Sequence, residues 1–430
     1  MFSRTPKLLT LLLGAAFLFI VATFFRLNQL FFMCSVLVVL PVVSYAFASW
    51  SLRGVTCERR VPDRLTEGQE VEISLILSNR SWLPKFLLKV EDHLPEWLEV
   101  TEDTSPVCII PVLLWGERFE HRYRVRARLR GLHRLGPAQA TAIDAFDLFR
   151  AYYGLAGTSE ILVYPRTVAL MNDPFAGGRV LGFATQPRAS ASPDGIDFYS
   201  TREYQPGDDL RRIHWRTTAR IGKFSVIEFE QSFSTHLALV LDVRAGIHVG
   251  RGPEATLEYA VRLAASLARY ELQRGNAVGL FACGEEPLEI PLASGMQQFA
   301  RILEALALVQ DDGEVSLAEA VREYEREFGR GTTVALFSPL LSEEIVEAVS
   351  ALRAQHLNVA YFFLDPVTFI APETSAREQG RARLGSQEAW KKATAAMLAA
   401  LHGLGVAVYR LCQGDDLRYG REWSERHVRA

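Results

Sequence analysis

The chain has 430 residues, a length that predicts two or three domains rather than one. Hydrophobic residues make up 49% and charged residues 23%, which argues for a folded protein and against global disorder. The formal net charge of -3 gives no whole-chain basis for nucleic-acid binding. The 5 cysteines are scattered without a CxxC pair, so they predict neither a disulfide framework nor a zinc site and suit a reducing compartment. They are Cys34, Cys57, Cys108, Cys283 and Cys412.

Two long uncharged segments lie near the N-terminus, at residues 8–25 and 30–50. Each is close to the roughly 20 residues that a bilayer-spanning helix needs. Because only residues 26–29 separate them, they predict a transmembrane helical hairpin within residues 1–52. A cleavable signal peptide fits less well, since a second span follows at once without a small-residue cleavage site. A buried hairpin in a soluble protein also fits less well, because neither segment has a polar stripe.

Positive charge predicts how this hairpin is oriented. Lysine and arginine are enriched on the cytoplasmic side of membrane helices. The connecting loop offers only Arg26, whereas several basic residues flank the hairpin on both sides: Arg4, Lys7, Arg53, Arg59 and Arg60. We therefore expect a multi-pass protein of the bacterial inner (plasma) membrane with both termini in the cytoplasm.

Residues 55–165 alternate as strands do, and prolines and glycines separate the runs, so we predict a β-sandwich-like domain. The predicted strands include 71–77, 86–90, 108–114, 118–129 and 161–164. One strand places a row of arginines on one face: Arg122, Arg124, Arg126, Arg128 and Arg130. We favour a solvent-exposed face, because arginine is mostly an exposed residue. Contact with anionic lipid headgroups is the alternative.

Residues 195–430 predict a doubly wound α/β domain, because short apolar runs alternate with helical patterns. The predicted strands are 237–241, 277–283, 332–337, 359–364 and 406–411, and the predicted helices are 255–273, 295–309, 317–328, 342–355 and 387–402. Binding sites of such domains lie at the carboxyl ends of the strands. Residues 184–194 predict a linker, and residues 377–386 a polar loop.

A polar motif at residues 202–220 precedes this domain. Pro206-Gly207 predicts a turn, Asp208 can cap a short helix, and Asp209 suits its first turn. The motif resembles the defining stretch of the bacterial domain-of-unknown-function family 58. Three flanking segments resemble that family too: 130–137, 147–150 and 163–166.

The resemblance implies that the α/β region is von Willebrand factor type A-like. Such domains often hold a divalent cation with a D-x-S-x-S loop after the first strand, plus a threonine and an aspartate from later loops. Only the first aspartate matches here, so the resemblance implies a degenerate site, no metal and no cofactor. The aligned positions are Asp242, Arg244, Gly246, Val315 and Pro339, with Ser316 as the nearest substitute for Val315.

The sequence favours a binding protein over an enzyme. Acid–base chemistry by Glu203, Asp208, Asp209 and His214 is the alternative, but these residues also fit a capped helix with ion pairs to neighbouring arginines. The resemblance implies work beside a MoxR-type AAA+ ATPase and transglutaminase-like membrane proteins. We expect no nucleic acid as a partner, because acidic residues lie beside the arginines of the motif. We expect Ile213 and Trp215 to be buried. The candidate docking residues are Glu203, Tyr204, Pro206, Gly207, Asp208, Asp209, Arg211, His214 and Trp215.

Overall fold

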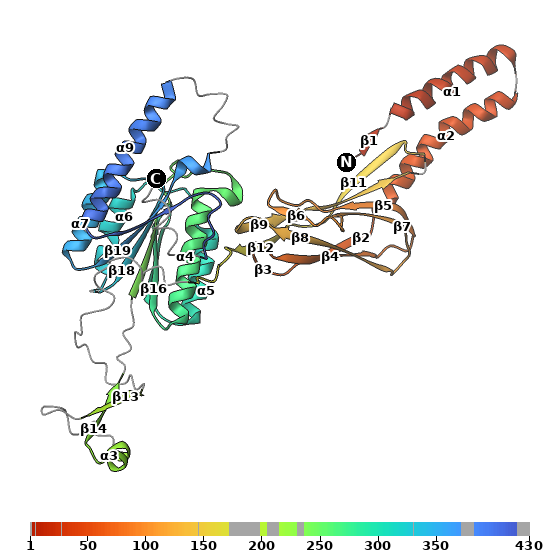
Figure 1. Cartoon of the computed structure of the whole chain (residues 1–430). Helices are drawn as coiled ribbons and strands as arrows, with labels where there is room; N and C mark the ends of the chain where they lie inside the picture. The colour runs from red at the N-terminus through yellow and green to blue at the C-terminus, as the bar shows by residue number, and fades with distance from the viewer. Residues whose placement is uncertain are drawn as a thin grey trace. The chain divides into compact units, whose positions relative to one another are not determined.

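A computed structural model describes residues 2–418 except for 5, 27, 145, 330 and the segments 172–197, 204–214, 230–235 and 371–381 (Figure 1). The chain divides into two compact units. The first contains residues 1–167, 250–265 and 303–310, and the second contains the remaining residues from 168 onward. All strands of the α/β sheet belong to the second unit, whereas its helices α4 (Thr256–Gln273) and α5 (Met296–Leu308) have residues in both.

The N-terminal hairpin forms as predicted, from α1 (Pro6–Phe25) and α2 (Asn28–Ser51). Both helices are long and apolar enough to cross a membrane, with mean hydropathies of 2.6 and 2.4. Few of their side chains are buried in the protein, so a surface of large apolar residues remains exposed. This pattern is the opposite of that expected for a core helix of a soluble protein.

Both ends of the hairpin join the same β region. Before α1, the short strand β1 (Phe2–Arg4) pairs antiparallel with β11 (Phe149–Ala156). At the other end, Ala48 and Leu52 at the end of α2 belong to the core of the β region, and β2 follows directly. The structure therefore places the start of α1 and the end of α2 on one side of the hairpin.

The β region contains sheets of five, four and three strands, with orders β1-β11-β10-β5-β7, β2-β4-β8-β6 and β3-β12-β9. This confirms the predicted β-rich region. Alternate residues of β4, such as Ile73, Leu75 and Leu77, are fully buried in a shared core. The strands not yet bounded are β2 (Val55–Arg60), β3 (Arg64–Thr66), β4 (Glu70–Asn79), β5 (Lys85–Glu91), β6 (Leu98–Val100), β7 (Val107–Leu113), β8 (Arg118–Ala127), β9 (Gly131–Leu135), β10 (Ala138–Ile143) and β12 (Ser159–Tyr164).

A buried ion pair lies inside the β region. Arg59 donates from Nε to Asp92 at 2.9 Å and from Nη2 at 2.5 Å, and both side chains are almost fully buried. The hydroxyl of Tyr123 also donates to Asp92, at 2.7 Å. This pair links β2 to the residue just after β5, so it holds two of the sheets together.

The arginine row of β8 is exposed from Arg122 to Arg128, as the alternation predicts. Glutamates of the same and neighbouring strands pair with it: Glu70, Glu72, Glu99 and Glu120. These pairs neutralise the row, which favours a solvated face over contact with anionic lipid. For Arg130 the predicted exposure is wrong. This residue follows β8, is only 6% exposed and pairs with Glu258 within the first unit.

The α/β region is a six-stranded sheet in the order β17-β16-β15-β18-β19-β20. Its five predicted strands are present and parallel; β17, at one edge, is antiparallel and was not predicted. The strands are β15 (His236–Leu241), β16 (Ala277–Cys283), β17 (Pro287–Ala293), β18 (Thr333–Ser338), β19 (Asn358–Leu364) and β20 (Ala407–Leu411). The mixed, mostly parallel sheet is consistent with a von Willebrand factor type A-like domain.

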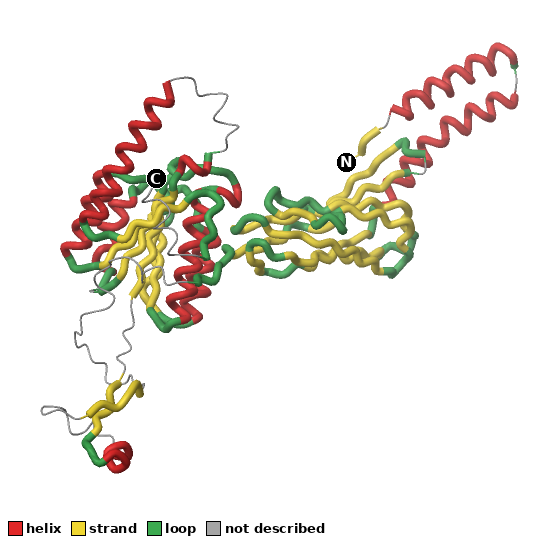
Figure 2. The backbone as a smooth tube through the Cα atoms, viewed as in Figure 1, coloured by secondary structure: helices red, strands yellow, loops and turns green. Residues whose placement is uncertain are grey.

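Helices flank this sheet, and Figure 2 shows α4 and α5 on one side of it and α6, α7 and α9 on the other. They are α4 (Thr256–Gln273), α5 (Met296–Leu308), α6 (Leu317–Tyr324), α7 (Glu343–Ala354) and α9 (Ala382–Gly403). Because α9 begins at Ala382, the end of the predicted loop 377–386 is helical, and the prediction is wrong there. The predicted linker 184–194 lies outside the described residues.

Candidate functional site

The centre of the α/β sheet contains a topological switch point. From β15 the chain crosses to β16 on one side, whereas β18 pairs with β15 on the other. In parallel sheets the loops diverge at such a point and leave a crevice at the carboxyl ends of the strands. Asp242 directly follows β15, and Ser338 is the last residue of β18, so both lie at this crevice.

Asp242 is only 3% exposed, yet it carries a carboxyl group. The hydroxyl of Ser338 donates to its Oδ2 at 2.6 Å, and the backbone N–H of Arg244 donates to Oδ1 at 3.4 Å. Burial raises the pKa of Asp242, and the hydrogen bond from Ser338 partly opposes this shift. The aspartate therefore holds the two strand ends together at a cost in desolvation.

A close backbone approach positions the loop after β15. Gly313 accepts from the N–H of Ala245 at 2.8 Å and donates to the carbonyl of Val243 at 3.0 Å. A Cβ at Gly313 would lie 2.2 Å from the carbonyl oxygen of Cys283, so only glycine fits here. This contact brings Arg244 beside the segment that leads to Ser316.

Two helices begin at the crevice. Ser316 caps α6 in a capping box, accepting from the N–H of Glu319 at 3.3 Å while the Glu319 carboxylate accepts from the N–H of Ser316 at 3.1 Å. The N–H and the hydroxyl of Ser316 both donate to the Glu319 carboxylate and lower its pKa. Ser342 caps α7 by accepting from the N–H of Ile345 at 3.3 Å. Helix N-termini carry partial positive charge, so both ends favour a negative group in the crevice.

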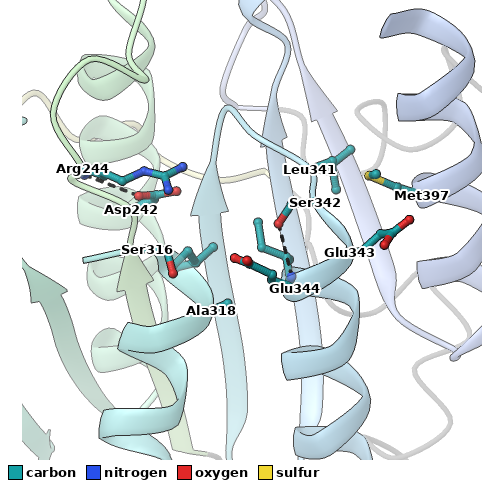
Figure 3. A pocket seen from close by; sticks show the side chains of 11 residues that line it. Asp242, Arg244, Ser316, Ala318, Leu341, Ser342, Glu343, Glu344 and Met397 are labelled. Atoms are coloured by element: carbon teal, nitrogen blue, oxygen red, sulfur yellow. Dashed lines mark hydrogen bonds between the residues drawn. The ribbon is translucent and has the colours of Figure 1, made fainter. Parts of the chain in front are cut away.

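The result is a pocket of about 420 Å³ between these elements (Figure 3). Its lining is partly apolar, with Leu341 and Met397, and Figure 3 shows Arg244 on the opposite side from these two residues, with Glu344 reaching from α7. Arg244 is the one cation among the lining residues, and its Nε is buried without a hydrogen-bond partner in the described structure. The pocket is lined by Asp242, Arg244, Ser316, Leu317, Ala318, Leu341, Ser342, Glu343, Glu344, Ile345 and Met397.

Two of the aligned metal positions, Asp242 and Arg244, line this pocket. Ser316 lines it, whereas Val315 packs against the hydrophobic core. Ser338, and not Pro339, contacts Asp242. Gly246 is exposed in the loop beyond Arg244. Within the described residues, no group of three or more His, Cys, Asp or Glu side chains could hold a metal ion. Arg244 puts a cationic side chain at the position where the second ligand would be a serine hydroxyl, and the metal-free site stays our prediction.

The predicted docking motif is only partly described. Tyr204, Pro206, Gly207, Asp208, Asp209, Arg211 and His214 lie outside the described residues, as does Ile213. Glu203 ends β13 (Phe198–Glu203), which pairs antiparallel with β14 (Ser225–Phe229) in a separate sheet. Trp215 begins α3 (Trp215–Ile221).

The predicted burial of Trp215 is wrong, since this side chain is 65% exposed. Its ring contacts Phe224, itself 54% exposed, at a centroid distance of 6.4 Å. The strand that follows α3 does not join the α/β sheet, because β14 pairs with β13 in a separate two-stranded sheet that leaves Trp215 exposed.

Apolar N-terminal helices, β sheets and a mostly parallel α/β sheet with a pocket at its switch point define a multidomain protein with a von Willebrand factor type A-like domain. Residues 200–374 match the family model "Protein of unknown function DUF58". These residues therefore contain a region of this family, which confirms the resemblance of the central motif.

Two relatives extend the match. The chain is 27% identical over 297 residues to "Uncharacterized protein YeaD" of Bacillus subtilis (strain 168), covering 67% of this chain and 70% of that protein. It is 29% identical over 238 residues to "Uncharacterized protein Rv1480" of Mycobacterium tuberculosis (strain ATCC 25618 / H37Rv), covering 52% and 74%. A solved Salmonella alpha-2-macroglobulin mutant aligns with 27% of this chain and 7% of its own at 22% identity and a TM-score of 0.21, a likeness that carries no argument.

Proposed function

We propose that this protein is a membrane-anchored interaction protein of the cytoplasm, not an enzyme, and that the switch-point pocket binds a segment of a protein partner. The observation that carries this proposal is Arg244, whose buried Nε has no hydrogen-bond partner in the described structure. A buried donor without an acceptor costs about 1–3 kcal/mol. A ligand that supplies an acceptor would remove this cost on binding.

The chemistry of the pocket supports an acidic side chain as the inserted group. A guanidinium pairs with a carboxylate through two parallel hydrogen bonds. The N-termini of α6 and α7 favour the same charge. Glu343 and Glu344, exposed at the first turn of α7, disfavour a ligand with several negative charges and favour a basic residue nearby. The expected ligand is therefore a protein segment with one acidic residue next to a basic one.

The resemblance to the family suggests who supplies that segment. We propose a MoxR-type AAA+ ATPase as partner, with a transglutaminase-like membrane protein as a second one. The N-terminal hairpin would anchor the chain in the bacterial inner membrane, with its N- and C-termini in the cytoplasm. A reporter that is active only in the periplasm should be silent when fused after Ala430.

Affinity capture from native membranes, followed by mass spectrometry, tests the binding proposal. Arg244→Gln removes the charge but keeps much of the side-chain volume, and we expect it to lose the partners that the parent captures. Arg301→Gln is the matched control, because Arg301 is exposed on α5 and outside the pocket. Equal capture by both variants would refute the pocket as the binding site.

The enzyme alternative uses Glu203, Asp208, Asp209 and His214 for acid–base chemistry. Under that alternative, Asp209→Asn and His214→Ala would abolish an enzymatic activity and leave the capture of partner proteins unchanged. The docking role of the motif predicts the reverse for both folded variants. The exposed pair of Trp215 and Phe224 supports docking, since exposed aromatic side chains are enriched as anchors in protein interfaces.

A further inference from the structure

Three chain segments meet where the hairpin joins the β region. The N–H of Arg80, in the turn after β4, donates to the carbonyl of Gly54 at 2.8 Å. In the turn after β7, Gly116 donates to the carbonyl of Asn79 at 3.0 Å. The turns after β4 and after β7 therefore lie beside the end of α2.

A buried lysine fixes this junction. Lys85 is 2% exposed, and its Nζ donates to the carbonyl of Trp50 at 2.8 Å. Burial lowers the pKa of Lys85. The last carbonyls of a helix lack partners within the helix, and a cation there also favours the helix dipole. Lys85 thus caps the C-terminal end of α2 and fixes the position of that end against the β region.

The surface at this junction is apolar and aromatic. Trp50, Trp82 and Trp115 are 57%, 77% and 72% exposed, and Leu114 is 55% exposed. Phe47 of α2 stacks on Phe86 of β5 at a centroid distance of 6.4 Å, so the apolar surface continues from the helix onto the sheet. Two exposed arginines lie in the same segments, Arg53 and Arg80.

This composition matches one environment. Tryptophan is enriched where a membrane meets water, because its ring is apolar and its N–H needs a polar partner. Arginines at the same depth attract anionic headgroups. Three exposed tryptophans at one end of a domain would be a liability in water, but they are expected where two apolar helices leave the domain.

We infer that this surface lies in the headgroup layer of the bilayer that holds α1 and α2. We call it the interfacial surface and define it by Trp50, Arg53, Arg80, Trp82, Leu114 and Trp115. The inference rests on the proposed membrane anchoring. It adds that the β region is not tethered below the membrane but lies against it in one orientation.

Quenching of tryptophan fluorescence by lipids brominated near the carbonyl groups tests this inference on the full chain in proteoliposomes of phosphatidylethanolamine and phosphatidylglycerol. The parent should be quenched strongly, and the double variant Trp82→Phe/Trp115→Phe should lose most of that quenching, with Trp50 left as the remaining source. Trp97→Phe is the control. Trp97 lies next to β6, and β6 pairs with the end of β8 that is farther from Trp115. The length of β8 puts Trp97 about 30 Å from Trp115.

Equal quenching in the double variant and the Trp97 control would overturn the inference. The inference would also be overturned if the interfacial surface were covered by a second copy of the chain. That outcome would appear as dimers cross-linked at these positions, without quenching of the tryptophans by the brominated lipids. Alkaline carbonate extraction separates this failure from failure of the anchoring itself. If the chain stays in the membrane pellet while the double variant keeps full quenching, the anchoring holds and only the interfacial surface is refuted.

Discussion

The β region and the α/β region bury their strands in different ways, and the difference determines where charges lie. In β4 and β8, buried residues alternate with exposed or half-buried ones, and the exposed face of β8 carries arginines paired with glutamates. In β18 every residue is buried, because helices cover both faces of the sheet. Charges next to such a strand therefore lie beyond its ends, as Asp242 does after β15. Charge on the β face is spread and neutralised, whereas Asp242 and Arg244 lie together in one pocket at the carboxyl ends of the central strands.

The largest expected effect comes from the buried ion pair of the β region. Asp92→Ala leaves the Arg59 guanidinium buried without its partner, and we expect a loss of about 3–5 kcal/mol in unfolding free energy. Glu70→Ala removes the exposed partner of Arg126 and should cost about 1 kcal/mol or less. Both losses in unfolding free energy are measured by denaturant titration, with hydrogen exchange in β2 and β4 as the readout. Similar losses for the two variants would contradict the comparison.

The next largest effect is expected from a cavity in the α/β sheet, which should unfold separately from the β region. Phe337 is fully buried in β18, and its ring stacks on Phe362 at 4.7 Å. We expect Phe337→Ala to destabilise the α/β sheet by about 3–5 kcal/mol because it leaves a cavity. Hydrogen exchange should then accelerate in β15, β18 and β19 and stay unchanged in β4 and β8. Equal acceleration in both sets of strands would show one cooperative unit.

A smaller effect is expected from pH at the pocket. Because burial raises the pKa of Asp242 above its ordinary 3.8, the folded chain holds this proton more tightly than the unfolded chain does. Its contribution to stability is present at low pH and is lost as pH rises through the raised pKa. Asp242→Asn should flatten this fall in the unfolding free energy of the α/β sheet. An unchanged pH profile in that variant would assign the fall to another group.

The smallest effect on stability should come from the docking motif. Because Trp215 is exposed, Trp215→Ala should change the unfolding free energy by about 0.5 kcal/mol or less. We expect this variant, with Asp209→Asn and His214→Ala, to lose partner capture while remaining folded. Lys223→Gln, exposed and outside the motif, is the control. Full capture by all three motif variants would remove the motif from the interface.

The sequence by itself determined the elements with a strong local signal. The uncharged runs at 8–25 and 30–50 predicted α1 and α2, and the continuous apolar run at 277–283 predicted β16 with the same bounds. Such patterns are local, because a helix or a doubly buried strand repeats its burial along a few consecutive residues. By contrast, β17 alternates in burial at the sheet edge and was missed.

Only the tertiary structure decided which distant residues meet. It placed Ser338 on Asp242 and Ser316 in the pocket, each one residue from the aligned position, because the end of a strand depends on pairing with its neighbours. It buried Arg130 at the end of a row of exposed arginines and left Trp215 exposed, although the sequence predicted the reverse for both. Burial of a single side chain depends on partners far along the chain, and no local pattern specifies those partners.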